Sequence, residues 1–335
     1  MNQKIYYPWL SHFSKFTVFS TLLLIFIGAL VKSHEVGLSV PDWPTTYGEN
    51  MFAFPLSDMV GGIFYEHGHR LMATFVGFLT LCQTIWLSIT KVDRWLKTIG
   101  FISLCAVIIQ GLFGGLTVIF YLPTIVSIIH GTLAQTFFAI LIIISYSLSK
   151  ERFYRNDKVK ISSQIYNRAL IIGLIIYLQL ILGALVRHTS SGLAIPDFPT
   201  MGGTLLPFFN DSMLNFVNNH LFEMDRDMVS IHQVVIHFFH RLGALILSLI
   251  FLVFFFKYRN QFKYNKTINF SLWSILITIL FQIFLGAATV LSERNEIITS
   301  LHVLNGALLL GLTVLLVLRL SPLKYSNWRT LQVFK

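Results

Sequence analysis

The amino-acid sequence predicts an all-α integral membrane protein with eight transmembrane helices, arranged as two tandem, pseudo-symmetric four-helix bundles. Three observations predict this fold class: the composition, the length of the apolar stretches, and a sequence unit that occurs twice. Of the 335 residues, 55% are hydrophobic and 12% are charged, and the mean hydropathy is +0.69. Soluble proteins rarely reach this apolar content, so the composition excludes an ordinary soluble enzyme or binding module.

The apolar stretches have the length of membrane spans. A helix of about 20 apolar residues crosses a bilayer core that is roughly 30 Å thick. Lipid offers no hydrogen-bond partners to the backbone, and these stretches are apolar on all faces, so we expect helices and not barrel strands. The expected spans cover approximately residues 13–31, 67–90, 96–119, 125–148, 168–187, 233–256, 268–291 and 297–319.

The distribution of Lys and Arg predicts the orientation. If both termini are cytoplasmic, all but six of the 25 basic residues lie in cytoplasmic segments. The net charge of +10 then reflects membrane topology and attraction to anionic lipid, and it gives no indication of nucleic-acid binding. We expect a multi-pass protein of the cell (inner) membrane. The six exceptions, for which we expect anionic partners on the extracytosolic side, are Lys32, Arg70, Arg187, Arg226, Arg241 and Arg294.

Internal repetition divides the chain into two halves. The segment "GALVKSHEVGLSVPDWPTTYG" (28–48) returns as "GALVRHTSSGLAIPDFPTMGG" (183–203) at an offset of 155. "EHGHR" (66–70) returns as "HFFHR" (237–241) at an offset of 171, so the second outer loop is 16 residues longer. We expect bundles at residues 1–150 and 168–335, joined by a basic cytoplasmic linker at 151–167. Because both halves begin inside, the repeat axis lies along the membrane normal.

Each half places two histidines at the outer starts of its second and fourth helices, namely His69 with His130 and His240 with His302. Ionisable groups are costly inside a membrane, so four of them at repeated positions predict ligands and not isolated core imidazoles. Zinc or copper would require further N, S or carboxylate donors, and no repeated donor accompanies the pairs. Two imidazoles facing each other across a bundle suit haem iron, whose porphyrin supplies the other four nitrogens. The sequence therefore predicts two haem sites.

Haem would also supply the anions that the outer basic residues require. Its two propionates would lie at the outer end of each bundle, where Arg and Lys form charge-assisted hydrogen bonds with carboxylates. The candidate residues are Lys32 and Arg70 in the first half and Arg187 and Arg241 in the second. The alternative is snorkelling of these side chains to the membrane interface. Their positions repeat together with the histidines, which favours the haem interpretation.

The two halves differ at one titratable position. Glu66 lies three residues before His69 and shares its helix face, whereas His237 occupies the corresponding place in the second half. A carboxylate beside a haem in low dielectric can hold or pass a proton, which predicts proton chemistry in the first half only. The alternative makes Glu66 a salt-bridge partner of Arg70. The role of His67 is left open.

Taken together, these motifs resemble the haem A synthase family. The resemblance rests on "ExxHR" at residues 66–70, on "HR" at 240–241, on the lone His130 and His302, and on the duplicated "GALV…GL…PDWP" loop. It extends from about Gly28 to His302. The resemblance implies a membrane oxidoreductase that converts the C8 methyl group of haem O to the formyl group of haem A, by two successive oxidations, for the assembly of haem-copper oxidases.

The resemblance also implies a role for each half. In that family the C-terminal histidine pair holds a haem b cofactor and the N-terminal pair receives the substrate. His240 and His302 would therefore be the axial ligands of haem b, and His69 and His130 would meet haem O. Glu66 would be the catalytic carboxylate. Some members carry a cysteine pair in the first outer loop, and this chain has none there.

Two alternative functions belong to other classes: a quinol-linked di-haem electron-transfer cytochrome, and a haem delivery protein without chemistry. Such a cytochrome usually places its haems at different depths, whereas these four histidines all begin helices on the outer side. The enzyme is therefore favoured. The expected partners are haem O and its synthase, a farnesyl transferase, together with the lipid bilayer and a membrane redox partner. A second copy of the chain, in a homo-oligomer, is a further candidate partner.

Overall fold

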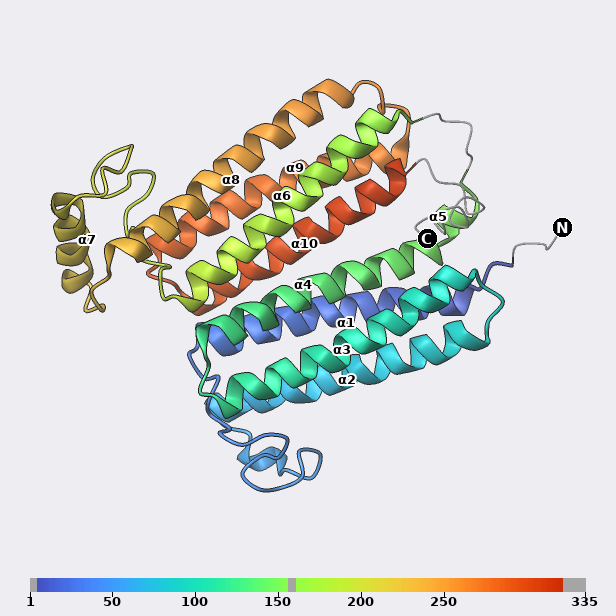
Figure 1. Ribbon diagram of the computed structural model, residues 1–335, viewed down its shortest axis with the longest axis horizontal. Helices are drawn as coiled ribbons and strands as arrows, with labels where there is room; N and C mark the ends of the chain where they lie inside the picture. The colour runs from blue at the N-terminus through green and yellow to red at the C-terminus, as the bar shows by residue number, and fades with distance from the viewer. Residues whose placement is uncertain (1–4, 156–160, 322–335) are drawn as a thin grey trace, which may run out of the picture.

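The computed structural model describes residues 5–155 and 161–321, and within them the chain is almost entirely helical (Figure 1). Within these two ranges, eight helices are long and apolar enough to cross a membrane, which confirms the predicted fold class. They are α1 (Pro8–Ser33), α2 (Gly62–Ile89), α3 (Arg94–Ile119), α4 (Thr124–Ser147), α6 (Ser163–His188), α8 (Ile231–Tyr258), α9 (Lys266–Leu291) and α10 (Glu296–Leu320). Most extend a few residues beyond the predicted apolar stretches, because the flanking polar residues continue the helix past the hydrocarbon core.

The long helices form two bundles of antiparallel neighbours, α1–α4 and α6 with α8–α10 (Figure 1). In the first bundle α1 and α3 each pack against both α2 and α4, so α2 and α4 lie diagonally opposite each other. In the second bundle α6 and α9 each pack against both α8 and α10, so these two are likewise diagonal. The helices that carry the four predicted ligands are therefore the diagonal pairs, whose side chains meet in the centre of each bundle.

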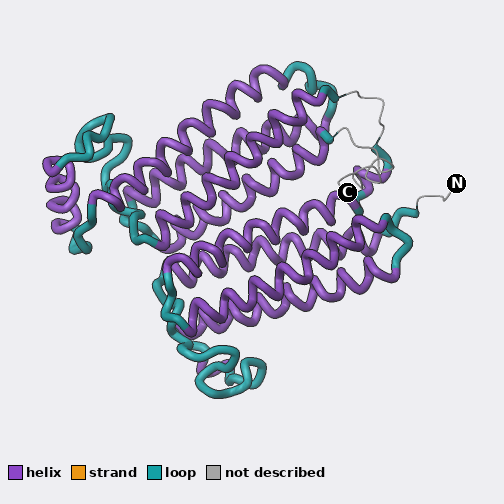
Figure 2. The backbone as a smooth tube through the Cα atoms, in the orientation of Figure 1, coloured by secondary structure: helices purple, strands orange, loops and turns teal. Residues whose placement is uncertain are grey.

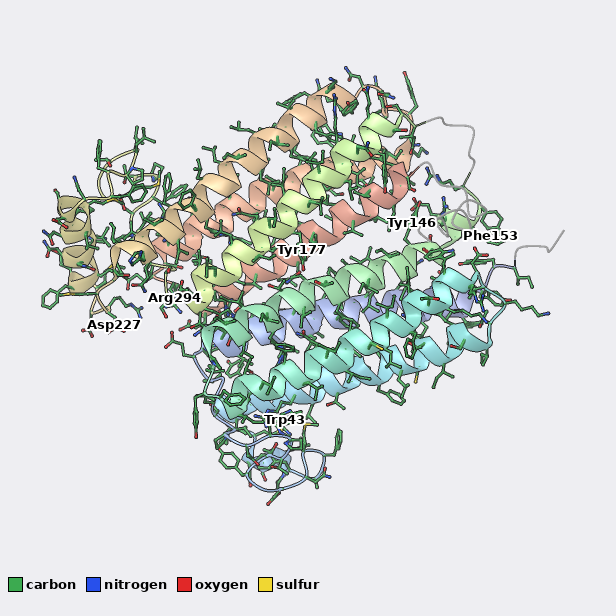
Figure 3. The ribbon with its side chains drawn as sticks, in the orientation of Figure 1. Trp43, Tyr146, Phe153, Tyr177, Asp227 and Arg294 are labelled. Atoms are coloured by element: carbon green, nitrogen blue, oxygen red, sulfur yellow. The ribbon has the colours of Figure 1, made fainter. Side chains whose placement is uncertain are left out.

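The two bundles meet along α1 and α4 on one side and α6 and α10 on the other. A hydrogen bond of 2.6 Å joins Thr136 of α4 to the hydroxyl of Tyr177 of α6, and Figure 3 shows Tyr177 between the bundles. At the end of the bundles near the termini, Arg319 of α10 forms a 2.7 Å ion pair with Glu151 in the short helix α5 (Lys150–Phe153).

Loops are confined to the two ends of the bundles (Figure 2). Following the charge-based orientation, we call the end with the two long loops the outer end. The two large buried apolar clusters lie toward the other end, as the positions of Leu10, Leu87 and Leu148 show for the first bundle, and two smaller clusters lie in the second outer loop. The predicted linker lies partly in α5 and α6, and its residues 156–160, like the basic residues in 1–4 and 322–335, fall outside the described residues.

The second outer loop contains a helix that sequence analysis did not predict. Helix α7 (Asp211–Glu223) runs across the ends of the long helices (Figure 1). The side chain of Asn210 caps it by accepting a 2.9 Å hydrogen bond from the amide of Met213. Met213, Val217 and Leu221 are buried at a spacing of four residues, which is one face of a helix. The first loop has only a 3-10 turn, η1 (Leu56–Asp58).

Candidate functional site

Each predicted haem ligand packs against a glycine of an adjacent helix. In each of the four glycine–histidine pairs, a β-carbon added to the glycine would lie 2.9–3.2 Å from the Cε1 atom of the histidine, which is closer than an ordinary van der Waals contact. The absence of a side chain on the neighbouring helix therefore makes room for the imidazole. The pairs are Gly28 with His69, Gly114 with His130, Gly183 with His240, and Gly286 with His302.

The imidazoles come from the diagonal helices and point into the bundles. The rings of His240 and His302 are 6.4 Å apart, centre to centre, and inclined at 73°. The Nδ1 atoms of His69, His130 and His302 are buried and have no hydrogen-bond partner in the described part of the chain, which costs about 1–3 kcal/mol for a buried polar atom. Buried imidazole nitrogens of this kind fit histidines that bind a ligand.

The donor set is too small for a protein-only metal centre. Within the described ranges, no group of three or more His, Cys, Asp or Glu side chains could hold a metal ion. A metal bound by two imidazoles alone would need its remaining ligands from elsewhere, and the porphyrin of a haem supplies four. The residues that are present therefore fit a haem in each half: His69 with His130, and His240 with His302.

Three glutamines, not identified from the sequence, hold the backbone at the histidines. Each donates from its Nε2 to the carbonyl oxygen of a histidine on an adjacent helix, at 2.8–3.0 Å. Their position in the sequence could have identified them, because each is a polar residue inside an apolar span. Gln110 and Gln282 also begin two segments that repeat, "QGLFGGLTV" (110–118) and "QIFLGAATV" (282–290). The pairs are Gln110 with His130, Gln179 with His240, and Gln282 with His302.

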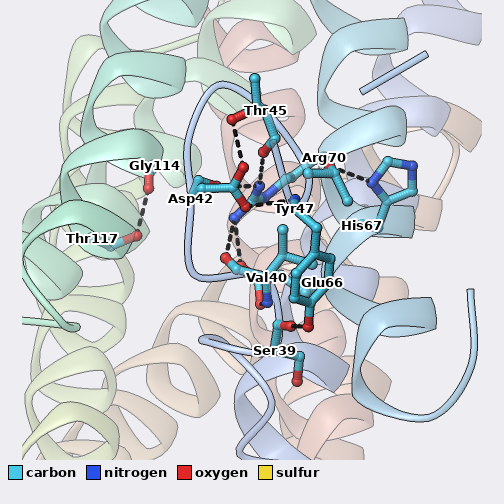
Figure 4. A network of polar contacts seen from close by, with 11 residues as sticks. Ser39, Val40, Asp42, Thr45, Tyr47, Glu66, His67, Arg70, Gly114 and Thr117 are labelled. Atoms are coloured by element: carbon cyan, nitrogen blue, oxygen red, sulfur yellow. Dashed lines mark hydrogen bonds and ion pairs between the residues drawn. The ribbon is translucent and has the colours of Figure 1, made fainter. Parts of the chain in front are cut away.

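The carboxylate of Glu66 is turned toward the first outer loop (Figure 4). Its Oε2 accepts a 2.8 Å hydrogen bond from the amide of Val40, and its Oε1 accepts a 2.7 Å bond from Nη2 of Arg70. Only 4% of the residue is exposed. This is the geometry of the salt-bridge alternative. The catalytic role of Glu66 stays a prediction.

His237 makes the equivalent contacts in the second half. Its Nδ1 lies 3.2 Å from the amide of Ile195, the counterpart of Val40, and its Nε2 lies 3.2 Å from Nε of Arg241. Like Glu66, it is 4% exposed. A neutral imidazole has one acceptor nitrogen, so it satisfies one of these two donors, whereas a carboxylate satisfies both. Glu66 and His237 therefore hold equivalent positions of the two outer loops, Val40 and Ile195.

Arg70 and Arg241 bind the outer loops through backbone carbonyls. Arg70 donates to three of them at 2.7–3.0 Å, and Arg241 donates to the three corresponding carbonyls at 2.7–3.2 Å. These contacts explain why "HR" recurs in both halves. The pairing of the two arginines with propionates stays a prediction. The acceptors are Val40, Asp42 and Thr45 for Arg70, and Ile195, Asp197 and Thr200 for Arg241.

The "PDWP" and "PDFP" segments form turns, each with a cis peptide bond before its second proline. Asp42 accepts hydrogen bonds from Thr45 Oγ1 at 2.5 Å and from the amides of Tyr47 and Gly48 at 2.8 and 2.9 Å. Burial raises the pKa of Asp42, but these bonds outweigh it and lower the pKa to about 2. His67, which sequence analysis left open, lies 3.0 Å from Thr46 Oγ1 and so also contacts this loop.

The Trp43 ring of the first turn lies against Gly115 of α3, where a β-carbon would be 2.6 Å from the ring (Figure 3). The loop thereby closes over the outer end of the first bundle, next to Gly114 and His130. Phe198 takes the corresponding place in the second loop, and the guanidinium carbon of Arg241 lies 5.9 Å from its ring centre.

Arg187 extends from the second half to the first. Its Nη2 donates to the carbonyl of Ala29 at 2.6 Å and to the hydroxyl of Ser33 at 3.1 Å, both in α1. Its Nη1 is buried without a partner. Lys32, the counterpart of Arg187, is partly buried at the outer end of α1. Unlike Arg70, Arg187 therefore has a guanidinium nitrogen that is available to an anion.

Besides Arg70, which pairs with Glu66, two of the six outer basic residues have anionic partners among the described residues. Arg294 lies 3.2 Å from Glu35, and Arg226 lies 3.8 Å from Glu293. They line a cavity of about 400 Å³ at the outer junction of the two halves, and Figure 3 shows Arg294 at this junction. An anionic partner from outside the chain is therefore not required for these two.

Comparison with known proteins agrees with the predicted resemblance. A protein named Heme A synthase from Lysinibacillus sphaericus is 26% identical over 332 residues, which cover 98% of this chain and 99% of that protein. Those of Staphylococcus saprophyticus and Staphylococcus aureus are 28% and 25% identical, over 93% and 90% of this chain and 95% and 94% of their own lengths. The family model described as cytochrome oxidase assembly protein matches residues 11–314. Because that match spans most of the sequence, the chain belongs to the COX15-CtaA family of cytochrome oxidase assembly proteins.

Proposed function

We propose that this protein is a haem A synthase, which oxidises the C8 methyl group of haem O to a formyl group in two steps. The observation that carries the proposal is the set of four histidines, each seated on a glycine of an adjacent helix, in a chain of this family. The second bundle is the haem b half, with His240 and His302 as axial ligands. The first bundle is the substrate half, where haem O meets His69 and His130.

The bound haem supplies the redox chemistry, and the protein positions the groups and handles protons. Glu66 is the proton-handling residue, because it is the carboxylate that shares a helix with His69 and has no acidic counterpart in the second half. Both of its oxygens accept hydrogen bonds. Taking up a proton at Oε2 would break the bond from Val40, so proton transfer at Glu66 is coupled to the first outer loop.

The basic residues hold the propionates in two ways. Arg187 and Lys32 contact them directly, because Nη1 of Arg187 is buried without a partner and Lys32 lies at the equivalent place. Arg70 and Arg241 act through the loops to which they donate. The farnesyl tail of haem O lies among apolar helix faces or in lipid, so the substrate arrives from its synthase, a farnesyl transferase, within the bilayer.

The depth of the histidines favours the enzyme over a cytochrome that carries electrons across the membrane. His69, His130, His240 and His302 all lie within about three turns of the outer ends of their helices. Two haems held there would lie at one depth, on what we expect to be the extracytosolic side of the cell membrane. Haem delivery without chemistry would leave Glu66 as an anchor of the first outer loop and would not explain why this anchor is a carboxylate in the first half and an imidazole in the second.

The assignment of the halves is tested on purified protein by absorption spectroscopy. We expect a low-spin b-type spectrum that is lost in His240→Ala and His302→Ala and largely kept in His69→Ala. His220→Ala is the control, because this histidine lies on α7, away from the bundle centres. Loss of the resident haem in the first-half variant alone would reverse the assignment. Haem binding without any haem A formed from supplied haem O would favour the cytochrome.

A further inference from the structure

The four histidines differ in how firmly other side chains hold them. Three have a glutamine donating to their carbonyl oxygen, and no glutamine of residues 5–155 and 161–321 donates to that of His69. The position that corresponds to Gln179 in the first half, at the repeat offset of 155, is Leu24. A leucine has no donor, so the α2 backbone at His69 lacks the side-chain hydrogen bond that Gln179 provides at His240.

The two glutamines at equivalent positions, Gln110 and Gln282, differ in the hydrogen bonds that their own side-chain oxygens make. In the second half, Oε1 of Gln282 accepts a 2.7 Å hydrogen bond from Nδ2 of Asn305, which also donates to the carbonyl of Thr278 at 3.0 Å. In the first half, Leu133 occupies the place of Asn305, at the offset of 172 that also relates His130 to His302. Oε1 of Gln110 is buried and has no hydrogen-bond partner among the described residues. The amide of Gln282 is therefore fixed at both ends, and that of Gln110 at one end only.

The space for Gln179 is also specific to the second half. A β-carbon on Gly243 would lie 2.3 Å from Oε1 of Gln179, so a larger residue there would displace the glutamine. At the offset of 171, the corresponding residue of the first half is Met72. At three paired positions, the residue of the second half donates or makes room for a hydrogen bond, and the residue of the first half is apolar and does neither. The pairs are Gln179 with Leu24, Asn305 with Leu133, and Gly243 with Met72.

We propose that Gln179, Gln282 and Asn305 are positioning residues that fix the axial imidazoles of the second half and make that site retain its haem. The inference rests on the proposed function, and it deepens it. Side chains that orient a metal ligand from behind typically change the affinity for the metal group about 10- to 100-fold. A cofactor has to stay bound through many turnovers, whereas a substrate has to enter and leave. The second half has three of these hydrogen bonds: Gln179 to His240, Gln282 to His302, and Asn305 to Gln282. Among the described residues, the first half has only the bond from Gln110 to His130, so its site suits a haem that exchanges.

The test measures haem release from each half. Purified full-length protein is loaded with ferric protoporphyrin IX, and its transfer to excess apomyoglobin is followed by absorbance. His69→Ala, which lacks a first-half ligand, identifies the release phase of each half. We expect Asn305→Leu and Gln179→Leu to accelerate the second-half phase about 10- to 100-fold. Gln110→Leu is the matched control and should leave that phase unchanged.

A second variant adds a hydrogen bond instead of removing one. Leu133→Asn gives Gln110 the partner that Gln282 has, and it should slow release from the first half. The electron paramagnetic resonance signal of the second-half haem should shift in Asn305→Leu and stay unchanged in Leu133→Asn. If Asn305→Leu or Gln179→Leu does not fold, the release rate of Leu133→Asn decides: slower release supports the proposal, and unchanged release overturns it.

The outcomes separate the inference from the function on which it rests. If the second-half release rate and resonance signal are unchanged in the double variant Gln179→Leu/Asn305→Leu, the positioning role is wrong, even though the haem still depends on His240 and His302. If the native protein binds no haem through these histidines, the proposed function itself fails.

Discussion

Arg70 is the residue whose removal should disturb the first outer loop most. The change Arg70→Met keeps an unbranched apolar side chain but removes all four hydrogen bonds of the guanidinium group, three to loop carbonyls and one to Glu66. The side chain of Arg70 is 9% exposed and that of Glu66 is 5% exposed, so little water is available to replace these contacts.

The size of the effect follows from the buried charge that is left behind. Removing one partner of a buried ion pair costs about 3–5 kcal/mol, because the remaining charge is desolvated without compensation. At about 1.4 kcal/mol per factor of ten, the loop should open roughly 100- to 3,000-fold more often. The matched variant Arg241→Met should have a smaller effect, about 1–3 kcal/mol, because it leaves a neutral His237 and not a carboxylate.

Hydrogen exchange followed by mass spectrometry measures this opening directly. The amide of Val40, which donates to Glu66, and the loop peptides up to Gly48 should lose protection in Arg70→Met. The second loop should be unchanged and acts as an internal reference. The double variant Arg70→Met/Glu66→Leu, which carries no buried charge, should recover part of the protection. Unchanged exchange in the first loop of Arg70→Met would refute the role of Arg70 as its anchor.

Three further outcomes are expected. Glu66→His copies the anchor of the second half, so the loop should stay ordered in hydrogen exchange while conversion of haem O stops; continued conversion would remove the catalytic role of the carboxylate. Gly286→Ala should alter the haem spectrum, because its β-carbon would lie 3.1 Å from His302, whereas Gly111→Ala, which meets nothing within 4 Å, should not. The pKa of Asp42 is lowered to about 2 from an ordinary value of 3.8, so its turn should be stabilised above pH 4 and lose that stabilisation as the pH falls toward 2. Asp42→Asn should abolish this pH dependence of amide exchange, and a pH dependence that survives the change would contradict the assignment.

The helices could be predicted from the sequence because a bilayer imposes a simple rule. Apolar length determines a span, and the repeat determines which spans are equivalent, so the eight membrane-spanning helices of the described residues were all predicted. The structure also places the four histidines at the outer ends of diagonal helices, as their place in the repeat suggests. Helix α7 was missed because its apolar face has only Met213, Val217 and Leu221, in a segment too short and too polar for a span.

Side-chain partners were harder to predict, because the sequence gives the charge of a residue and not the acceptor it reaches. Arg70 and Arg241 were assigned to propionates from their positions in the repeat, and the structure shows that their donors contact loop carbonyls that lie 25–46 residues away in sequence. The loop has to fold back over the helix before those carbonyls are within reach. The contrast between Asn305 and Leu133 was visible in the repeat, but its meaning depends on the hydrogen bond to Gln282.

The conversion of haem O tests the central claim most directly. Cells that produce haem O but no haem A would express the native chain or Glu66→Gln, and their extracted haems would be separated by chromatography and identified by mass. The account predicts haem A with the native chain, and haem O or its hydroxymethyl intermediate with Glu66→Gln, while the variant keeps its b-type spectrum. Absence of haem A with a native chain that is folded and haem-loaded, or normal haem A with Glu66→Gln, would contradict it.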